Sequence, residues 1–206
     1  KGRCLFGKTV TQSCARVLAA ALLGLSLPVG SAQAAYWAES GDLRLRHDLQ
    51  LLADAGILHA PVTSWPIPWG DIAVDVEGHY PADWSNPAVR QALRRIQRRS
   101  RREARTGDFQ PHIRTVLASK PVGIRSFKDT PRESGEFEAG LEWMGRRFAM
   151  RLQGQAVSDP EDEETFRYDG SYIGAILGNW TLSVDTVDRW WGPGWDGSLV
   201  LSHNAR

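Results

Sequence analysis

The strongest constraint on the fold is an alternation of apolar and polar residues, with a period of two, in the second half of the chain. In the segment GEFEAGLEWMG (135–145), one face collects Phe137, Ala139, Leu141 and Trp143. The opposite face collects Glu136, Glu138, Gly140 and Glu142. Successive side chains of a β-strand point to opposite sides, so this pattern predicts a strand with one apolar and one charged face.

The same alternation recurs twice further along the chain. In 146–157, the apolar positions are Phe148, Met150, Leu152 and Ala156, and the polar positions are Arg147, Arg151, Gln153 and Gln155. In 180–185, Trp180, Leu182 and Val184 alternate with Thr181, Ser183 and Asp185. Glutamates on one predicted strand and arginines on the next would share a face, where opposite charges on neighbouring strands stabilise each other.

The connections between these segments alternate in length. Gly145-Arg146 and Gly178-Asn179 can each close a tight hairpin, whereas the polar stretches 128–135 and 158–165 form longer loops. Short turns on one side, longer loops on the other, and strands that are apolar outside and polar inside are typical of outer-membrane barrels. We therefore predict an antiparallel outer-membrane β-barrel. A soluble β-sandwich that places the same charges in water is the alternative.

The first 34 residues have the layout of a secretory signal peptide. Four basic residues without an acid (Lys1, Arg3, Lys8 and Arg16) precede an apolar run at 17–29. Ala32-Gln33-Ala34 then offers a cleavage site with small residues at the required positions. The apolar run is too short to span a bilayer, so we expect export with cleavage after Ala34.

Cleavage changes both the cysteine count and the charge. Cys4 and Cys14 leave with the signal peptide, and a mature part without cysteine suits a bacterial envelope protein better than a small disulfide-stapled fold. Removing four of the 25 basic residues leaves 21 against 24 acids, a net charge of −3 in place of +1. We expect no nucleic-acid partner.

Residues 35–110 carry helical patterns instead. In SGDLRLRHDLQLLADAGIL, Ser40 or Asp42 is the candidate N-cap, and Leu45, Leu49 and Leu52 form one apolar face. A proline-rich connection (61–71) follows, and a second helix is predicted to start at Ser85 or Asn86 with Pro87 in its first turn. We expect a helical plug over 35–110 and the first strands of a barrel over 111–206.

The second predicted helix is dense in arginine. It carries Arg90, Arg94, Arg95, Arg98, Arg99, Arg101, Arg102 and Arg105 against the single acid Glu103. A solvated face is the ordinary explanation of such a run. Contact with an anionic partner, such as lipid phosphate or an acidic glycan, is the functional alternative.

Several blocks of the chain resemble the capsule assembly Wzi family. They are GDLRLRHDLQLLADAGIL, WPIPWGDI, FKDTPRESGE, DGSYIGAILGNW and DRWWGPGWDGSLVLSHNAR. The resemblance runs from Gly41 to Arg206 and implies an outer-membrane barrel of about eighteen antiparallel strands with an N-terminal helical plug. It also implies a lectin, not an enzyme, that binds capsular polysaccharide and anchors the capsule to the cell surface. The chain starts at Lys1 and stops at Arg206 within a strand-like run, so we expect an N-terminal fragment.

The block RWWGPGWDGS (189–198) supplies the candidate polysaccharide-binding residues. Sugar rings have apolar faces, which stack on aromatic side chains, and polar rims, which bond to Asp and Arg. The candidates are Asp188, Arg189, Trp190, Trp191, Trp195 and Asp196. We expect the segment to form an external loop whose Gly-Pro-Gly bend splays the rings, and Arg189 to meet a uronate carboxylate through two bonds. Packing against the barrel wall is the alternative for the tryptophans.

Two other classes of protein remain as alternatives. A diffusion porin shares the wall but needs an open lumen, which a helical plug would fill. A glycoside hydrolase needs paired carboxylates, for which Asp185, Asp188 and Asp196 are the only local candidates. The five histidines show no metal-ligand spacing. We expect no catalytic residues, metal or cofactor, and name capsular polysaccharide and outer-membrane lipid as partners. The sequence does not indicate an oligomeric state.

Overall fold

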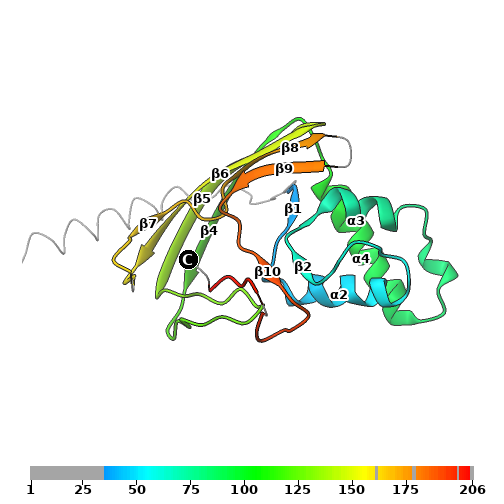
Figure 1. Ribbon diagram of the computed structural model, residues 1–206, viewed down its shortest axis with the longest axis horizontal. Coiled ribbons are helices and arrows are strands. Elements are labelled where there is room, and N and C mark those ends of the chain that lie inside the picture. The colour runs from blue at the N-terminus through cyan, green and yellow to red at the C-terminus, as the bar shows by residue number, and fades with distance from the viewer. Residues whose placement is uncertain (1–34, 161, 178–179, 199, 205–206) are drawn as a thin grey trace, which may run out of the picture. The chain divides into compact units, whose positions relative to one another are not determined.

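The structure, a computed structural model, describes residues 35–160, 162–177, 180–198 and 200–204. The predicted signal peptide with its cleavage residue Ala34, and the predicted turn residues Gly178 and Asn179, lie outside the described residues. Figure 1 shows a helical part followed in the chain by a β-sheet. None of the helices in the described ranges has both the length and the apolar character needed to cross a membrane.

The helical part contains seven short elements within the described ranges. In chain order these are β1 (Trp37–Ala38), α2 (Leu43–Asp54), β2 (Ser64–Trp65), β3 (Ile67–Pro68), α3 (Trp69–Val76), the 3₁₀ helix η1 (Pro81–Asp83) and α4 (Pro87–Glu103). The strands form two small antiparallel pairs, one of which joins β1 to β3. The other joins β2 to β10 (Trp190–Trp191), from the far end of the chain.

Both predicted helix starts are confirmed, and each is set by a capping side chain. Asp42 accepts hydrogen bonds from the backbone N–H groups of Arg44 and Leu45 at 3.0 and 2.9 Å. Asn86 accepts one from the N–H of Ala88 at 2.9 Å, with Pro87 as the first residue of α4. A cap satisfies donors that the first turn of a helix leaves without a partner.

The proline-rich connection is more ordered than the sequence suggests. Residues 61–71 contain β2, β3 and the start of α3. Pro68 is the cap of α3, in extended backbone geometry, and the helix begins directly after it. A proline lacks the N–H needed inside a helix or central strand but is tolerated at such a boundary, so the prolines here separate short elements.

The core of the helical part draws on segments far apart in sequence. The predicted apolar faces of α2 and α4 meet, with Leu49, Leu52 and Leu93 all 0% exposed. Trp65 is equally buried, and the ring of Phe127, from beyond the first long strand, lies 5.1 Å from it. Trp190 completes the cluster, with its ring centroid 5.6 Å from that of Phe127.

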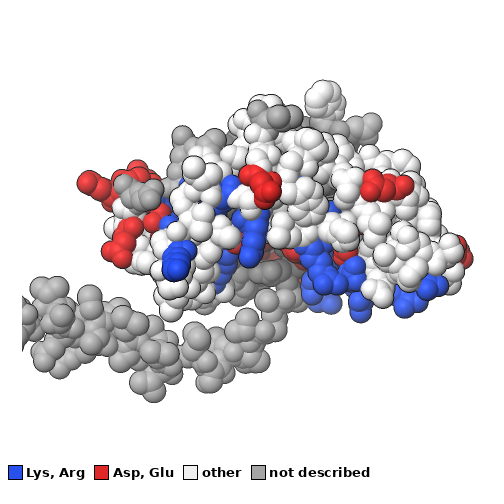
Figure 2. Space-filling view, turned by 90° about the horizontal axis from the view of Figure 1, so that it is seen from below, with Lys and Arg blue, Asp and Glu red and all other residues white. Residues whose placement is uncertain are grey.

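The arginines of α4 divide into two groups. Those on the side facing α2 are paired: Arg95 donates two hydrogen bonds to Asp48, at 2.6 and 2.7 Å, and Arg99 donates one to Asp42 at 2.6 Å. Arg99 also lies over the ring of Trp69, 5.2 Å from its centre. The others include Arg94, Arg98 and Arg101, which have no ion pair with any acid that the structure describes, and Figure 2 shows basic side chains gathered over the helical part.

The remaining long strands form one antiparallel sheet. Its strands are β4 (Phe109–Leu117), β5 (Gly135–Met144), β6 (Phe148–Ser158), β7 (Phe166–Arg167), β8 (Tyr172–Leu177) and β9 (Trp180–Asp185). They are ordered β4-β5-β6-β8-β9, and β7 also pairs with β6. The sheet begins at Phe109, so the predicted boundary at 110/111 falls inside β4. In the described part of the chain, the edge strands β4 and β9 do not pair with each other.

The two faces of the sheet follow the predicted alternation. Leu141 of β5 pairs with Leu152 of β6, and the two side chains are 41% and 67% exposed. On the other face Glu142 pairs with Arg151, and both are buried. Exposed large apolar side chains on the outer face of the long strands are Phe109, Ile113, Leu117, Phe137, Leu141, Phe148, Leu152, Ile173, Leu177, Trp180, Leu182 and Val184. The sheet is therefore apolar on its exposed side and charged on its inner side.

The connections follow the predicted rhythm. Residues 118–134 and 159–165 are the longer ones, whereas residues 145–147 and the two residues 178–179 are short. The N–H of Gly145 donates to the carbonyl of Phe148 at 2.7 Å and closes the first short turn. One feature was not predicted: β7 and β8 are separated at 168–171, where Ser171 bonds to the backbone of Gln153.

Candidate functional site

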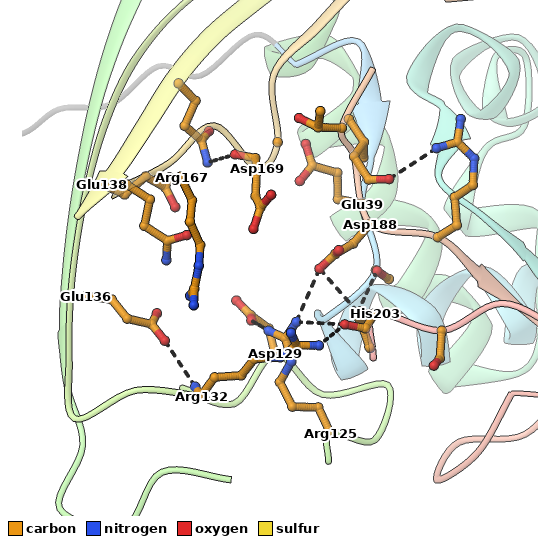
Figure 3. Close-up of a pocket in the computed structure, with 18 of the residues that line it drawn as sticks. Glu39, Arg125, Asp129, Arg132, Glu136, Glu138, Arg167, Asp169, Asp188 and His203 are labelled. Carbon is orange, nitrogen blue, oxygen red and sulfur yellow. Dashed lines mark hydrogen bonds and ion pairs between the residues drawn. The ribbon is translucent and has the colours of Figure 1, made fainter. Parts of the chain in front are cut away.

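A charged cavity of about 690 Å³ lies on the inner side of the sheet. Figure 3 shows lining side chains directed toward it from several segments, among them Glu138, Arg167 and Asp188. The acids that line it are Glu39, Asp129, Glu136, Glu138, Asp162, Glu164, Asp169 and Asp188. The bases are Arg114, Arg125, Arg132, Arg167, Arg189 and His203. Its other lining residues are mostly polar or small, with Val187 and Leu201 as the aliphatic ones.

The sheet supplies one wall of the cavity through its inner face. Glu138 of β5 pairs in register with Arg114 of β4 and Gln155 of β6, so the three side chains share that face. His112 lies 3.2 Å from Glu138 and 3.0 Å from Gln153. Strand geometry alone places these groups together, because residues opposite one another in adjacent strands project to the same side.

Loops supply the other walls, and ion pairs hold them in place. Arg125, in the connection after β4, donates to Asp129 at 3.2 Å and to Asp188 at 3.4 Å. Arg114 of the sheet donates to the same Asp129 at 2.7 Å. On the far side Arg167 donates to Glu133 at 3.1 Å. Most charges of the cavity are thus paired with one another, as a polar interior requires.

His203 is the one histidine, among the described residues, that lines the cavity. Its Nε2 lies 2.9 Å from the carbonyl oxygen of Ser126, which can only accept, so Nε2 carries the proton. Nδ1 then accepts from the hydroxyl of Ser40 at 3.2 Å. Burial lowers the pKa of His203 below its ordinary value and Arg125 lowers it further, while Asp188, 3.9 Å away, opposes them. The neutral ring therefore joins three segments through its two nitrogens.

The predicted binding loop does not project freely from the sheet. Trp190 and Trp191 form β10, which pairs with β2 of the helical part, and the N–H of Gly192 donates to the carbonyl of Thr63 at 2.9 Å. The expectation of a loop with three splayed rings is wrong for Trp190, which is 0% exposed. The physical reason is the large apolar area of the ring, which fills the core beside Phe127.

The other candidates differ from one another in exposure. Trp191 and Trp195 are 44% and 40% exposed, so each keeps a face open to solvent. Asp188 and Arg189 line the cavity, whereas Asp196 is exposed outside it. Arg189 does form a two-pronged pair, but with Asp185, at 2.7 and 3.1 Å, and not with an incoming carboxylate. The structure thus divides the six candidates among a core position, the cavity and an exposed loop.

Arg46 of α2 is the residue that holds this loop, and the sequence did not single it out. It is 3% exposed and donates to the backbone carbonyls of Gly192 and Pro193, at 3.3 and 2.9 Å. Its guanidinium lies 4.2 Å from the ring centre of Phe127 and 4.8 Å from that of Trp195. A cation over aromatic faces is attracted by their electrons. The available signal was its position three residues before Leu49, at the border of the apolar face.

No metal site accompanies the cavity within the ranges that the structure describes, since no three potential ligands from His, Cys, Asp and Glu are grouped to hold an ion. The cavity is instead a surface of paired charges with exposed aromatic rings nearby. Such a surface can bind a polar ligand by exchanging internal ion pairs for bonds to that ligand, and can contact its apolar faces through Trp191 and Trp195.

Comparison with known proteins agrees with the sequence blocks. Residues 109–206 match the family model of capsule assembly protein Wzi. An uncharacterised 55.8 kDa protein of the cps region of Klebsiella pneumoniae is 28% identical over 189 residues, which are 91% of this chain and 36% of that protein. The matched region thus extends through most of the helical part.

A solved structure is also similar to this chain. It is Wzi of Escherichia coli, an outer membrane protein involved in group 1 capsule assembly and a carbohydrate-binding β-barrel. The TM-score is 0.60 with 25% identity, over 81% of this chain and 36% of that one. The chain thus spans about a third of the length of the two relatives. The resemblance to the capsule assembly Wzi family inferred from the sequence is thus confirmed, by the family model over residues 109–206 and by the two similar proteins.

Proposed function

We propose that this chain supplies the plug and the first strands of an outer-membrane lectin that binds capsular polysaccharide and anchors the capsule to the cell. One observation carries the proposal: the sheet exposes its apolar side chains and turns its charged ones toward a cavity. A soluble sheet does the reverse, because water favours the charged face. If lipid surrounds the exposed face of the sheet and water fills the cavity, both the apolar and the charged side chains meet a solvent that suits them.

The two edge strands support the proposed closure into a barrel. An edge strand has a row of backbone groups without partners, and in lipid each such group costs several kcal/mol. β4 and β9 are edges in the described residues, so further strands are needed to close the wall. The family's barrel of about eighteen strands would provide them. The helical part, held to the sheet side by Trp190 and Arg46, would then act as the plug.

Sugar contact is assigned to the cavity and to the exposed part of the loop. Trp191 and Trp195 offer ring faces, and Asp188, Arg189 and Asp196 offer charged groups near them. Trp190 is proposed to support the loop from the core and not to touch the ligand, because its ring is buried. Stacking of a sugar on an aromatic ring requires an accessible face, which two of the three tryptophans provide.

One of the local carboxylates is unsuited to be the acid of a glycosidase. A glycosidase needs one carboxylic acid to donate a proton and a second carboxylate to act as base or nucleophile. Asp185, one of the local candidates, is engaged by both nitrogens of Arg189 and by the hydroxyl of Ser183 at 2.7 Å. A carboxylate so bonded is held in its charged form and has no proton to donate.

The test uses the full-length protein in capsulated cells that lack their own copy. The double variant Trp191→Ala, Trp195→Ala should release capsule into the medium while its heat-modifiable gel mobility, the sign of a folded barrel, stays unchanged. Tyr80→Ala is the matched control, because Tyr80 is an exposed aromatic residue (69%) outside the cavity lining. Unchanged capsule retention in the double variant would overturn the site assignment.

A second measurement separates binding from cleavage. Purified full-length protein is incubated with purified capsule, and chain length and reducing ends are followed. Retention of the polymer at constant length supports the lectin. Shortened chains or new reducing ends would instead establish an enzyme.

A further inference from the structure

One face of α4 carries a stripe of five arginines that the proposed function does not use. They are Arg90, Arg94, Arg98 and Arg101 of the helix, and Arg105, which lies two residues after its end. Four of the side chains are exposed and Arg90 is partly so. The first four are spaced by four, four and three residues, which places them on one side of a helix with 3.6 residues per turn, and Arg105 continues the series just after the C-cap.

The opposite side of α4 is the one that packs into the core. Val89, Leu93 and Ile96 are buried there, so the stripe faces away from the protein. No large apolar side chain of α4 is exposed. The stripe is therefore a purely cationic surface whose backing helix is fixed in place by its buried face.

The stripe differs from the other arginines of the same helix in having no acidic partner. Arg95, Arg99 and Arg102 each have a carboxylate oxygen within 4.0 Å. Among the described residues, no acidic side chain lies within that distance of any stripe arginine. Arg98 of the stripe donates a hydrogen bond from Nε to the backbone carbonyl of Arg94, in the same helix, at 3.2 Å.

Such a stripe is unfavourable for the isolated helix. Like charges three or four residues apart on a helix repel each other and cost a few tenths of a kcal/mol per pair, and three successive pairs of the stripe lie within α4. An external anion would remove that repulsion. Asp48 and Asp42 do not do so, because they are bonded to Arg95 and Arg99 instead.

We propose that the arginine stripe of α4 is a second contact surface for the polysaccharide, and that the polymer it takes is acidic, with carboxylate groups along its length. The inference deepens the proposed function and rests on it. With a rise of 1.5 Å per residue the helical part of the stripe, from Arg90 to Arg101, extends about 16 Å, and its charges repeat about every 5–6 Å. That is a linear array, suited to a linear polyanion lying along the helix, where each guanidinium binds a carboxylate.

A membrane surface is the less suitable occupant. Helices that bind the surface of a bilayer combine basic residues with apolar side chains that enter the lipid. The apolar side chains of α4 are buried in the protein core, and none accompanies the stripe. Charge alone would have to hold the helix to lipid, whereas a flexible polyanion can follow the stripe along its full length.

The experiment measures binding of the full-length protein, in detergent, to three probes. They are polygalacturonate, the same polymer with its carboxyl groups reduced, and vesicles containing phosphatidylglycerol. The stripe variant changes all five arginines to Gln. It should bind polygalacturonate at least about tenfold more weakly, since each exposed pair contributes a few tenths to 1 kcal/mol. The wild type should bind the reduced polymer as weakly as the variant binds the acidic one.

Two controls exclude trivial losses. Changing the five arginines to Lys keeps the charge, so most of the binding should remain. The double variant Arg146→Gln, Arg147→Gln removes two exposed charges from the short turn after β5 and should leave binding unchanged. Heat-modifiable mobility verifies that each variant is folded.

The outcomes separate this inference from the proposed function. If the wild type and the stripe variant bind polygalacturonate equally, or if the stripe serves only the vesicles, the inference is overturned. Binding of the natural capsule is measured in parallel. If the wild type and the stripe variant both bind capsule equally well, the role of the stripe is refuted and the proposed anchor is not. If the wild type binds polygalacturonate but not capsule, and the stripe variant binds neither, the stripe is supported and the anchor is refuted.

Discussion

The helical part and the sheet of this protein place their apolar side chains in opposite directions. In the helical part, Leu49, Leu93 and Trp65 are fully buried, and most of the arginine stripe of α4 is exposed. In the sheet, Leu152 and Val184 are 67% and 79% exposed, while Glu142 and Arg151 are buried. The same hydrophobic effect produces both arrangements if the two parts meet different solvents, water around the helices and lipid around the sheet.

The largest effect is expected from removing a buried side chain from the core of the helical part. Trp65→Ala should cost about 3–5 kcal/mol of local stability, because a buried tryptophan is replaced by a cavity. Trp65 touches both Phe127 and the strand that carries Trp190, so the loop should loosen with the helices. Hydrogen exchange of the α2 and α4 amides in urea measures the loss.

The control for this change lies on the surface of α3. Val74 is 72% exposed, so Val74→Ala should alter stability by less than about 0.5 kcal/mol. If Trp65→Ala were equally harmless, the helical part would have no packed core of its own, and the contrast with the sheet would be lost.

The next test places a charge on the exposed face of the sheet. Leu152→Arg should cost about 2–4 kcal/mol if this position faces the middle of a bilayer. Folding of the full-length protein into phosphatidylcholine vesicles, followed by heat-modifiable mobility, measures the effect.

Gln155→Arg is its matched partner on the inner face. Gln155 lies three residues further along β6 and lines the cavity, so the same new charge should be tolerated there. If Leu152→Arg were tolerated and Gln155→Arg were not, the outer face would be in water, and the sheet would be an ordinary soluble one.

The smallest effect is expected at the start of α2, in the helical part, which we propose is surrounded by water. Asp42→Ala should cost about 1 kcal/mol, since it removes an N-cap. Partial burial alone would raise the pKa of Asp42, but the Leu45 N–H and Arg99 outweigh it, so the pKa lies below its ordinary value. Thermal unfolding at several pH values measures both effects.

The sign of the pH effect follows from that lowered pKa. The contribution of Asp42 is fully present above the unfolded-state pKa of about 3.9 and is lost as the pH falls through the lower folded-state value. Asp42→Asn keeps a capping oxygen and should retain most of the stability at neutral pH, without this acid dependence. A stability of Asp42→Asn as low as that of Asp42→Ala would show that Arg99, and not the cap, accounts for the effect.

Much of the fold could be predicted from local patterns. The alternation in 135–157 predicted the faces of β5 and β6, and Asp42 and Asn86 were correctly named as candidate caps. Each of these features depends on residues a few positions apart, whose relative directions are set by strand or helix geometry. The proline-rich stretch 61–71 was less predictable, because its short strands exist only through pairing with distant segments.

The candidate site was predicted in composition but not in arrangement. The segment 188–196 does border the cavity through Asp188 and Arg189. Its sequence does not indicate that Trp190 is buried while Trp191 is half exposed, because that depends on β2 being its neighbour. Arg46 was missed for the same reason, since its partners lie about 80 and 150 positions further along the chain.

The sequence by itself determined which side chains share a face, where the helices begin and which family the chain resembles. Those properties follow from the periodicity of one strand or helix and from the residues themselves. The tertiary structure alone decided that Trp190 and Phe127 enter the core of the helices, that Arg46 holds the loop, and that charges from several distant segments enclose one cavity. Contacts between distant segments depend on how whole elements pack, and no local period encodes that packing.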